Sequence, residues 1–122
     1  MKIIRDYIYV DPEDRGASVA VGNFDGVHLG HQSVIDLARQ TSETISAPLG
    51  ILTFEPHPRS YFAPQSPAFR LMSSEARSTR LAKLDVDLLY ELNFNTSLSS
   101  LTPREFSQNV IADGLGLSHL VV

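Results

Sequence analysis

The sequence predicts an α/β fold, a parallel sheet with helices on both of its faces. Short apolar or β-branched runs alternate along the chain with segments of helical periodicity, and such alternation produces βαβ units with right-handed crossovers. The chain has 122 residues, of which 43% are hydrophobic and 20% are charged, a balance typical of one compact globular domain. No internal repeat or linker divides it.

The first half of the chain predicts a strand, a helix and a second strand. Residues 17–24 form a short β-branched run that ends in glycine and polar residues, as buried strands do. From Leu29 to about Ile45 the spacing i, i+3, i+4, i+7 and i+11 of an amphipathic helix is filled by Val34, Leu37, Ala38, Thr41 and Ile45. Pro48 breaks this helix, and residues 49–54 form the second strand.

The middle of the chain is an irregular loop followed by a helix and a strand. Residues 55–72 contain four of the seven prolines and show no clear periodicity. A loop of that length in a compact domain is usually functional. We expect a second helix from Ser74 to Leu84 and a third strand over residues 87–92.

A third helix has clear start signals. The stretch Thr102–Glu105 combines a capping threonine, a proline at the first helical position and a glutamate three residues after the cap. This helix should end at Gly114 or Gly116, before a last strand that opens at residues 119–122. The alternation as a whole is Rossmann-like, and ligands of such sheets bind at the carboxyl ends of the strands.

Composition excludes several classes of protein. No apolar run approaches the roughly 20 residues that span a bilayer, and an acid at Asp6 precedes any hydrophobic stretch of a secretory signal. The absence of cysteine excludes a disulfide scaffold and a thiolate metal site, and a net charge of −4 disfavours nucleic-acid binding. We therefore expect a cytoplasmic protein without membrane or nucleic-acid partners. The match of Asn95–Ser97 to the glycosylation pattern is then accidental.

The stretch Gly22–His31, between the first strand and the first helix, carries the residues best suited to chemistry. It lacks the lysine and spacing of a P-loop and the glycine pattern of a dinucleotide fingerprint. If the helix begins near Val27, His28 and His31 share one face of its first turn, beside the free N–H groups and the positive end of the helix dipole. That position suits anionic phosphates, and Gly30 lets a ligand approach the backbone closely.

Several stretches of the chain resemble a known family. His28–His31 is similar to the HxGH signature of the adenylyl- and cytidylyl-transferase superfamily. The longer string Val21–Gln32 resembles the adenylyltransferase module of bacterial bifunctional riboflavin kinase/FAD synthetases, and Leu52–Pro58 is similar to that family's second signature. Arg70-Leu71 and residues 94–106 fit its later pattern. The resemblance covers essentially the whole chain and implies transfer of AMP from ATP to FMN, giving FAD and pyrophosphate.

The resemblance also implies roles for individual residues. His28 and His31 are the expected catalytic residues, which donate hydrogen bonds to ATP phosphates and offset charge on the departing pyrophosphate. The expected ATP-binding residues are Gly22, Asn23, Phe24, Asp25, His28, Gly30 and His31. The expected FMN-binding residues are Pro56, His57, Pro58 and Phe62. Mg²⁺ is expected to accompany ATP, no metal is expected on the protein itself, and the partners are the small-molecule substrates ATP and FMN.

Some of these residues have a second interpretation. His28 and His31 could simply cap the start of a helix, whereas zinc ligation by both with Asp25 is disfavoured because no cysteine or fourth ligand suggests itself. Asp25 either orients a histidine or caps the helix. His57 and Phe62 are equally well explained as a turn histidine and a core phenylalanine.

Other side chains are interpreted as structural. Phe24 is a hydrophobic plug whose backbone rather than its ring faces ATP, and Phe106 belongs to the core. Five of the ten cations lie between Arg59 and Lys83, which a solvated helix face mostly explains, although Arg59 or Arg70 could contact a phosphate.

Residues 1–122 are expected to form one FMN adenylyltransferase domain that is C-terminally incomplete relative to the family. In the family, the strand matching residues 119–122 leads into a Gly-x-Asp/Asn-Phe loop, and a Ser-Ser-Thr-x-x-Arg stretch and a riboflavin kinase domain follow; these are absent from the chain. One alternative is therefore a catalytically silent nucleotide- or flavin-binding fragment. Another is an HxGH adenylyltransferase with a different acceptor, such as pantetheine phosphate or nicotinate mononucleotide.

Overall fold

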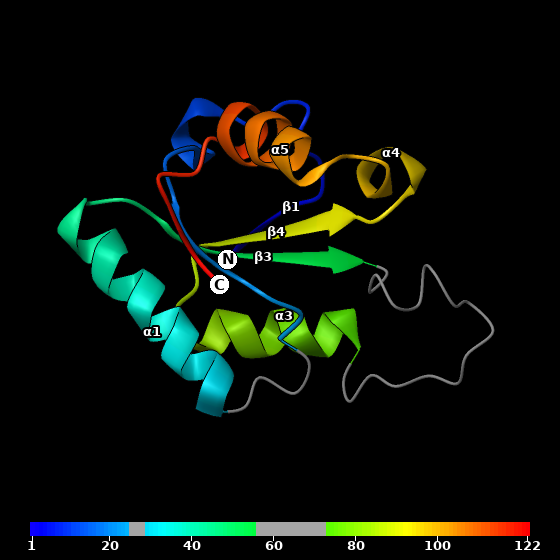
Figure 1. Cartoon of the computed structure of the whole chain (residues 1–122). Helices are drawn as coiled ribbons and strands as arrows, with labels where there is room; N and C mark the ends of the chain where they lie inside the picture. Colours follow the sequence, from blue (N-terminus) through cyan, green and yellow to red (C-terminus); the bar gives the residue numbers. More distant parts are fainter. Residues whose placement is uncertain (25–28, 56–72) are drawn as a thin grey trace.

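The computed structural model describes residues 1–24, 29–55 and 73–122. The strands in these ranges form a fully parallel sheet (Figure 1). In the described residues the sheet has five strands in the order β1-β4-β3-β2-β5. The strands are β1 (Lys2–Ile4), β2 (Ser18–Val21), β3 (Leu49–Glu55), β4 (Leu88–Asn93) and β5 (His119–Val121). The predicted α/β class and parallel sheet are confirmed.

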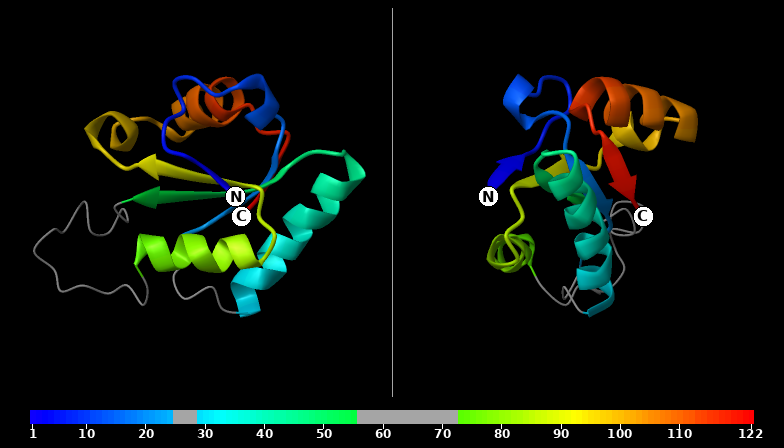
Figure 2. Two further views of the ribbon diagram at one scale, coloured as in Figure 1. Left: turned by 180° about the vertical axis from the view of Figure 1, so that it is seen from behind. Right: turned by 90° about the vertical axis from the view of Figure 1, so that its left-hand side faces the viewer.

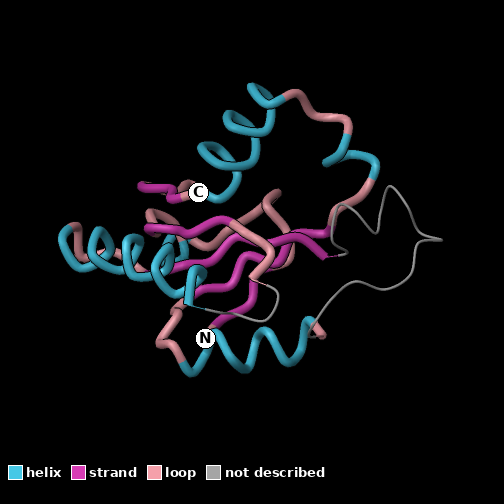
Figure 3. Tube along the Cα trace, turned by 60° about the horizontal axis from the view of Figure 1, so that its bottom comes forward, coloured by secondary structure: helices cyan, strands magenta, loops and turns pink. Residues whose placement is uncertain are grey.

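Helices cover both faces of the sheet, as predicted (Figure 2). One face carries α1 (Leu29–Thr44) and α3 (Ser74–Lys83). The other carries the short helix η1 (Pro12–Asp14), α4 (Thr96–Ser99), α5 (Pro103–Glu105) and the π-helix η2 (Phe106–Leu115). The strands lie between these two layers (Figure 3). Within the described part of the chain, every helix is too short or too polar to cross a bilayer.

The core has two halves, one on each side of the sheet. On β4, Leu88, Tyr90 and Leu92 pack on the side of η2, whereas Leu89 packs on the side of α1 and α3. This alternation follows from the two-residue period of a strand, and all four residues are buried because parallel sheets are covered on both faces. The hydroxyl of Tyr90 donates to the carbonyl oxygen of Asp14 at 2.8 Å, and burial raises the pKa of Tyr90 well above its usual value.

Helix α1 occupies the predicted segment, but its buried stripe is shifted around the helix. Leu37 and Ile45, expected on the apolar face, are 53% and 44% exposed. The buried positions are Ile35, Ala38 and Ser42, at i, i+3 and i+7. Ile35 and Ala38 pack in one core cluster with residues of β2 and β3, among them Ala20 and Ile51.

The helix predicted from Thr102 begins and ends where expected but is wound differently inside. Thr102 and Glu105 form the expected capping box, and Gly116 ends the helix in the left-handed conformation at φ 64°. Between them, residues 106–115 have π-helical winding, in which each N–H reaches five residues back. Gln108 donates to both carboxylate oxygens of Asp113 at 3.0 Å, a side-chain bond across the same five-residue interval.

Strand β1, helix η1 and helix α4 were not expected from the sequence. Each has only three or four residues, too few for a periodic pattern to be recognised. In α4 the side chain of Asn95 accepts a hydrogen bond from the backbone N–H of Leu98 at 2.9 Å. Asn95 therefore has a structural role as a helix cap, which is consistent with an accidental match to the glycosylation pattern.

Candidate active site at the carboxyl edge of the sheet

The candidate site begins where β2 ends. After Val21 the backbone N–H of Gly22 still donates to the carbonyl oxygen of Leu52 on β3, at 3.1 Å, and the chain then turns away at Asn23 and Phe24. This turn lies at the carboxyl edge of a parallel sheet, the edge at which such folds bind ligands. The predicted ATP-binding residues Gly22, Asn23 and Phe24 thus share one turn.

Phe24 anchors this turn in the core. Its side chain is 1% exposed, and its backbone has φ 53°, a left-handed conformation that is uncommon for a bulky residue. A Cβ atom on Gly22 would lie 3.1 Å from the Phe24 ring, so the glycine leaves room for the ring to fold under the turn. The ring is therefore buried as a plug, as the sequence indicated.

His31 lies in the first turn of α1 and packs on this plug. The two ring centroids of Phe24 and His31 are 5.1 Å apart, with an interplanar angle of 56°. His31 as a whole is partly buried, and Nδ1 of its ring is buried. The start of α1 also carries the positive end of the helix dipole. Gly30 belongs to the same helical turn.

The other predicted site residues lie outside the described residues: Asp25, His28, Pro56, His57, Pro58 and Phe62, with Arg59 and Arg70. Two of the three residues of the alternative zinc site, Asp25 and His28, therefore lie outside the described residues as well. Among the described residues, the group of acidic side chains close enough to share a metal ion is Asp11, Glu13 and Asp14. That group belongs to η1 and its cap, and Asp14 is already paired with Lys2.

A buried arginine that the sequence analysis missed joins the ends of three strands. The side chain of Arg77, on α3, is 3% exposed. Its Nη1 donates to the carbonyl oxygen of Asn23 at 3.1 Å, and its Nη2 donates to Glu55 Oε2 at 3.3 Å and to Glu91 Oε2 at 3.0 Å. Glu91 is 5% exposed, and its Oε1 lies 3.4 Å from Nε of Arg5. Two arginines and two glutamates thus balance each other at this edge.

The interpretation of the cations between Arg59 and Lys83 as a solvated helix face is wrong for Arg77. Glu91 could have predicted a buried cation, since it is a charge inside the otherwise mostly apolar strand 87–92 and a buried charge has to be paired. The sequence does not show which cation pairs with Glu91, because helix α3 and strand β4 are brought together only by the fold.

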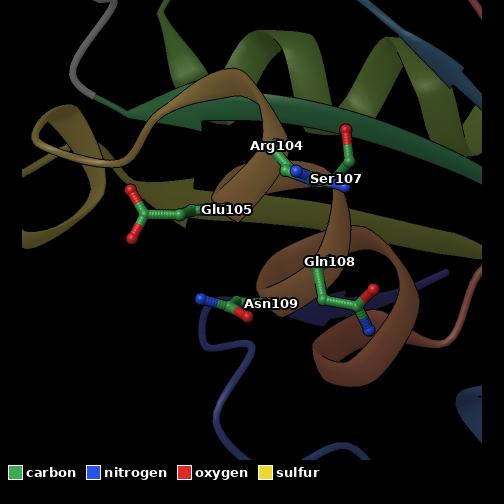
Figure 4. Close-up of a pocket in the computed structure, with 5 residues that line it drawn as sticks. All are labelled: Arg104, Glu105, Ser107, Gln108 and Asn109. Atoms are coloured by element: carbon green, nitrogen blue, oxygen red, sulfur yellow. The ribbon is translucent and has the colours of Figure 1, made fainter.

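Two hollows in the surface differ in their relation to this edge. One, of about 430 Å³, is lined by Arg5, Asp6, Glu55, Glu91 and Asn93, at the carboxyl ends of β1, β3 and β4. The other, of about 410 Å³, lies on a single stretch of helix (Figure 4), where it is lined by Arg104, Glu105, Ser107, Gln108 and Asn109. None of the predicted site residues lines the second hollow, which is a surface feature of α5 and η2.

A parallel sheet whose first strand–helix junction carries glycines and a partly exposed histidine at the carboxyl edge is the arrangement of an α/β nucleotide-binding domain. The chain belongs to the FAD synthetase family, whose model matches residues 10–122. The bifunctional riboflavin kinase/FMN adenylyltransferase of Pseudomonas fluorescens is 37% identical over 122 residues, which cover 100% of this chain and 39% of that protein. The enzyme of the same name from Bacillus subtilis is 37% identical over 111 residues, covering 89% and 35%.

A solved structure shows the same fold. The crystal structure of a protein described as a macrolide-efflux protein from Streptococcus pneumoniae superposes with a TM-score of 0.79 and 28% sequence identity, covering 98% of this chain and 39% of that one. The chain thus spans about two fifths of the length of the relatives that it matches over its whole length.

Proposed function

We propose that this chain transfers AMP from ATP to FMN, which gives FAD and pyrophosphate. Membership of the FAD synthetase family supports this activity, as do the names of the relatives, which are FMN adenylyltransferases. The observation that carries the proposal is the junction of β2 and α1. It holds the glycine turn, the Phe24 plug and His31 together at the edge where ligands bind.

In this reaction an oxygen of the FMN phosphate attacks the α-phosphorus of ATP. A new bond forms between this oxygen and the α-phosphorus. The bond from the α-phosphorus to the oxygen that bridges to the β-phosphorus breaks, and pyrophosphate leaves. Such a transfer needs no nucleophile from the protein, so catalysis consists of positioning the phosphates and stabilising the charge that develops on them.

The chain's own residues can supply both contributions. The first turn of α1 offers backbone N–H groups to the phosphates of ATP, and the imidazole of His31 donates a hydrogen bond to a phosphate oxygen. His28 is proposed to do the same, so that the two histidines share the charge of the departing pyrophosphate. Gly22, Asn23, Asp25 and Gly30 are proposed to complete the ATP site.

Magnesium enters this scheme as part of the MgATP substrate, where it neutralises phosphate charge. Of the described carboxylates at this edge, Glu55 and Glu91 are paired with Arg77 and Arg5, and Asp6 accepts a hydrogen bond from the backbone N–H of Ile8. This donor set suits an ion that arrives on the phosphates and keeps several of its waters, as Mg²⁺ usually does, rather than one held in a protein cage.

The FMN phosphate has to meet ATP at the same edge. Pro56 directly follows Glu55, the last residue of β3, and β3 is hydrogen-bonded to β2. We therefore propose that Pro56, His57, Pro58 and Phe62 contact FMN, with the Phe62 ring stacked on the isoalloxazine.

The identity of the acceptor is the direct test. The purified chain is incubated with MgATP and, in separate reactions, with FMN, nicotinate mononucleotide or pantetheine phosphate, and the products are identified by mass spectrometry. We expect FAD and pyrophosphate only in the reaction in which FMN is the acceptor. Transfer to another acceptor, or binding of ATP without transfer to any of them, would overturn the proposal.

A further inference from the structure

The guanidinium of Arg77 contacts the backbone of the turn Gly22–Phe24, where the proposed function places the phosphates of ATP. Its Nη1 donates to the carbonyl oxygen of Asn23 at 3.1 Å, directly before the buried Phe24. Arg77 comes from α3, fifty-four residues further along the chain. This contact therefore ties the turn to a helix that is distant in the sequence, on the same face of the sheet as α1.

The way in which Arg77 divides its donors argues against a purely structural ion pair. A buried arginine facing one carboxylate satisfies it best with two parallel bonds. Arg77 instead divides its donors among one backbone carbonyl and two carboxylates, Glu55 and Glu91. Among the described residues, its Nε has no hydrogen-bond partner. The guanidinium is thus oriented so that it reaches the turn, and leaving a buried donor unpaired costs stability.

We propose that Arg77 is a positioning residue for the ATP-phosphate site. The two glutamates fix the guanidinium, the guanidinium fixes the Asn23 carbonyl, and Asn23 fixes the plug on which His31 packs at 5.1 Å. Arg77 touches no reacting atom in this scheme. The inference rests on the proposed function only in taking this turn and His31 as the place where ATP phosphates bind.

Two variants separate positioning from stability. Arg77→Met leaves the buried carboxylate of Glu91 with the exposed Arg5 as its remaining cationic partner, so we expect the Tm to fall by roughly 10 °C or more. Arg77→Met combined with Glu91→Gln removes that buried charge, and Glu55 is exposed enough, at 34%, to be solvated. The double variant should therefore regain most of the lost Tm, while the Asn23 carbonyl still lacks its donor.

ATP affinity and kcat then distinguish a positioning role of Arg77 from a structural one. Isothermal titration with MgATP and the rate of FAD formation are measured on each variant. A positioning role predicts that the double variant keeps a Kd for ATP raised about tenfold or more and a kcat lowered by up to about 100-fold, even though its Tm has recovered, because small displacements at a reacting centre cost that much. If ATP affinity and kcat recover together with the Tm, Arg77 is a structural residue and the inference is overturned.

Arg39 provides a matched control. Arg39→Met also removes a guanidinium that donates to a backbone carbonyl, that of Leu84 at 2.7 Å, but away from the turn. We expect a lower Tm with an unchanged Kd for ATP; an equal loss of ATP affinity would overturn the inference. A wild-type chain that binds ATP but makes no FAD would contradict the proposed function, and the titrations would still decide the role of Arg77.

Discussion

Replacement of His31 separates its packing on Phe24 from the phosphate contact that we propose for it. In His31→Ala the aromatic contact with Phe24 is lost, and such a pair contributes about 0.5–1.5 kcal/mol. Because His31 is only partly buried and alanine suits a helix, the fold should survive with a Tm lowered by a few degrees. If His31 is a phosphate donor as proposed, its loss should have a larger effect, lowering kcat by roughly 10²–10³-fold, or about 2.7–4 kcal/mol.

A second substitution at the same position distinguishes the two effects. His31→Phe keeps an aromatic ring against Phe24 but has no donor, so the Tm should stay near that of the wild type while kcat falls as far as in His31→Ala. Gln40→Ala, at an exposed position further along α1, is the matched control and should leave both unchanged. FAD formation is followed by chromatography at saturating ATP and FMN. Normal turnover in a folded His31→Phe variant would refute the assignment and favour a residue that merely packs at the helix start.

Three further predictions concern stability. Thr102→Ala removes the α5 cap and should cost about 1 kcal/mol in a denaturant titration. Because hydrogen bonds from the backbone and side chain of Thr102 lower the pKa of Glu105, the stabilisation by that carboxylate is present at neutral pH and is lost as the pH falls through its lowered pKa; an NMR titration that finds a raised pKa would contradict this. Gly114→Ala places a Cβ atom 2.8 Å from the carbonyl oxygen of Asn109 and 2.9 Å from that of Tyr7. The backbone then has to shift, at a cost of about 1–3 kcal/mol in the free energy of unfolding. An unchanged unfolding midpoint would show that the backbone of η2 can move without loss of stability.

Long elements with a clear period could be predicted from the sequence. Helix α1 and strands β3 and β4 occupy the segments that their patterns indicated, and the capping box at Thr102 fixed the start of α5. The π-helical winding of residues 106–115 could not be predicted, because it changes which backbone groups pair without leaving a distinct pattern over ten residues. Very short elements such as β1 are formed by pairing with a distant strand, here β4, rather than by local preference.

The candidate site was only partly predictable for a similar reason. The turn at Gly22–Phe24 and His31 belong to one continuous motif, so reading along the chain was enough to find them. Arg77 and Glu91 are fourteen residues apart on different elements, and only the packing of α3 against the sheet brings their charges to 3.0 Å. The displaced stripe of α1 has the same origin, since the covered face depends on β2 and β3 rather than on the helix alone.

Mapping where ATP binds tests the central claim most directly. In ¹H–¹⁵N NMR spectra of the wild-type chain titrated with MgATP, we expect the largest shifts at the amides of Gly22, Asn23 and His31. The amides of Ser18 and Leu49, at the amino ends of β2 and β3, should stay in place. Shifts that gather at the amino edge of the sheet, or no shifts at millimolar MgATP, would contradict a phosphate site at the start of α1.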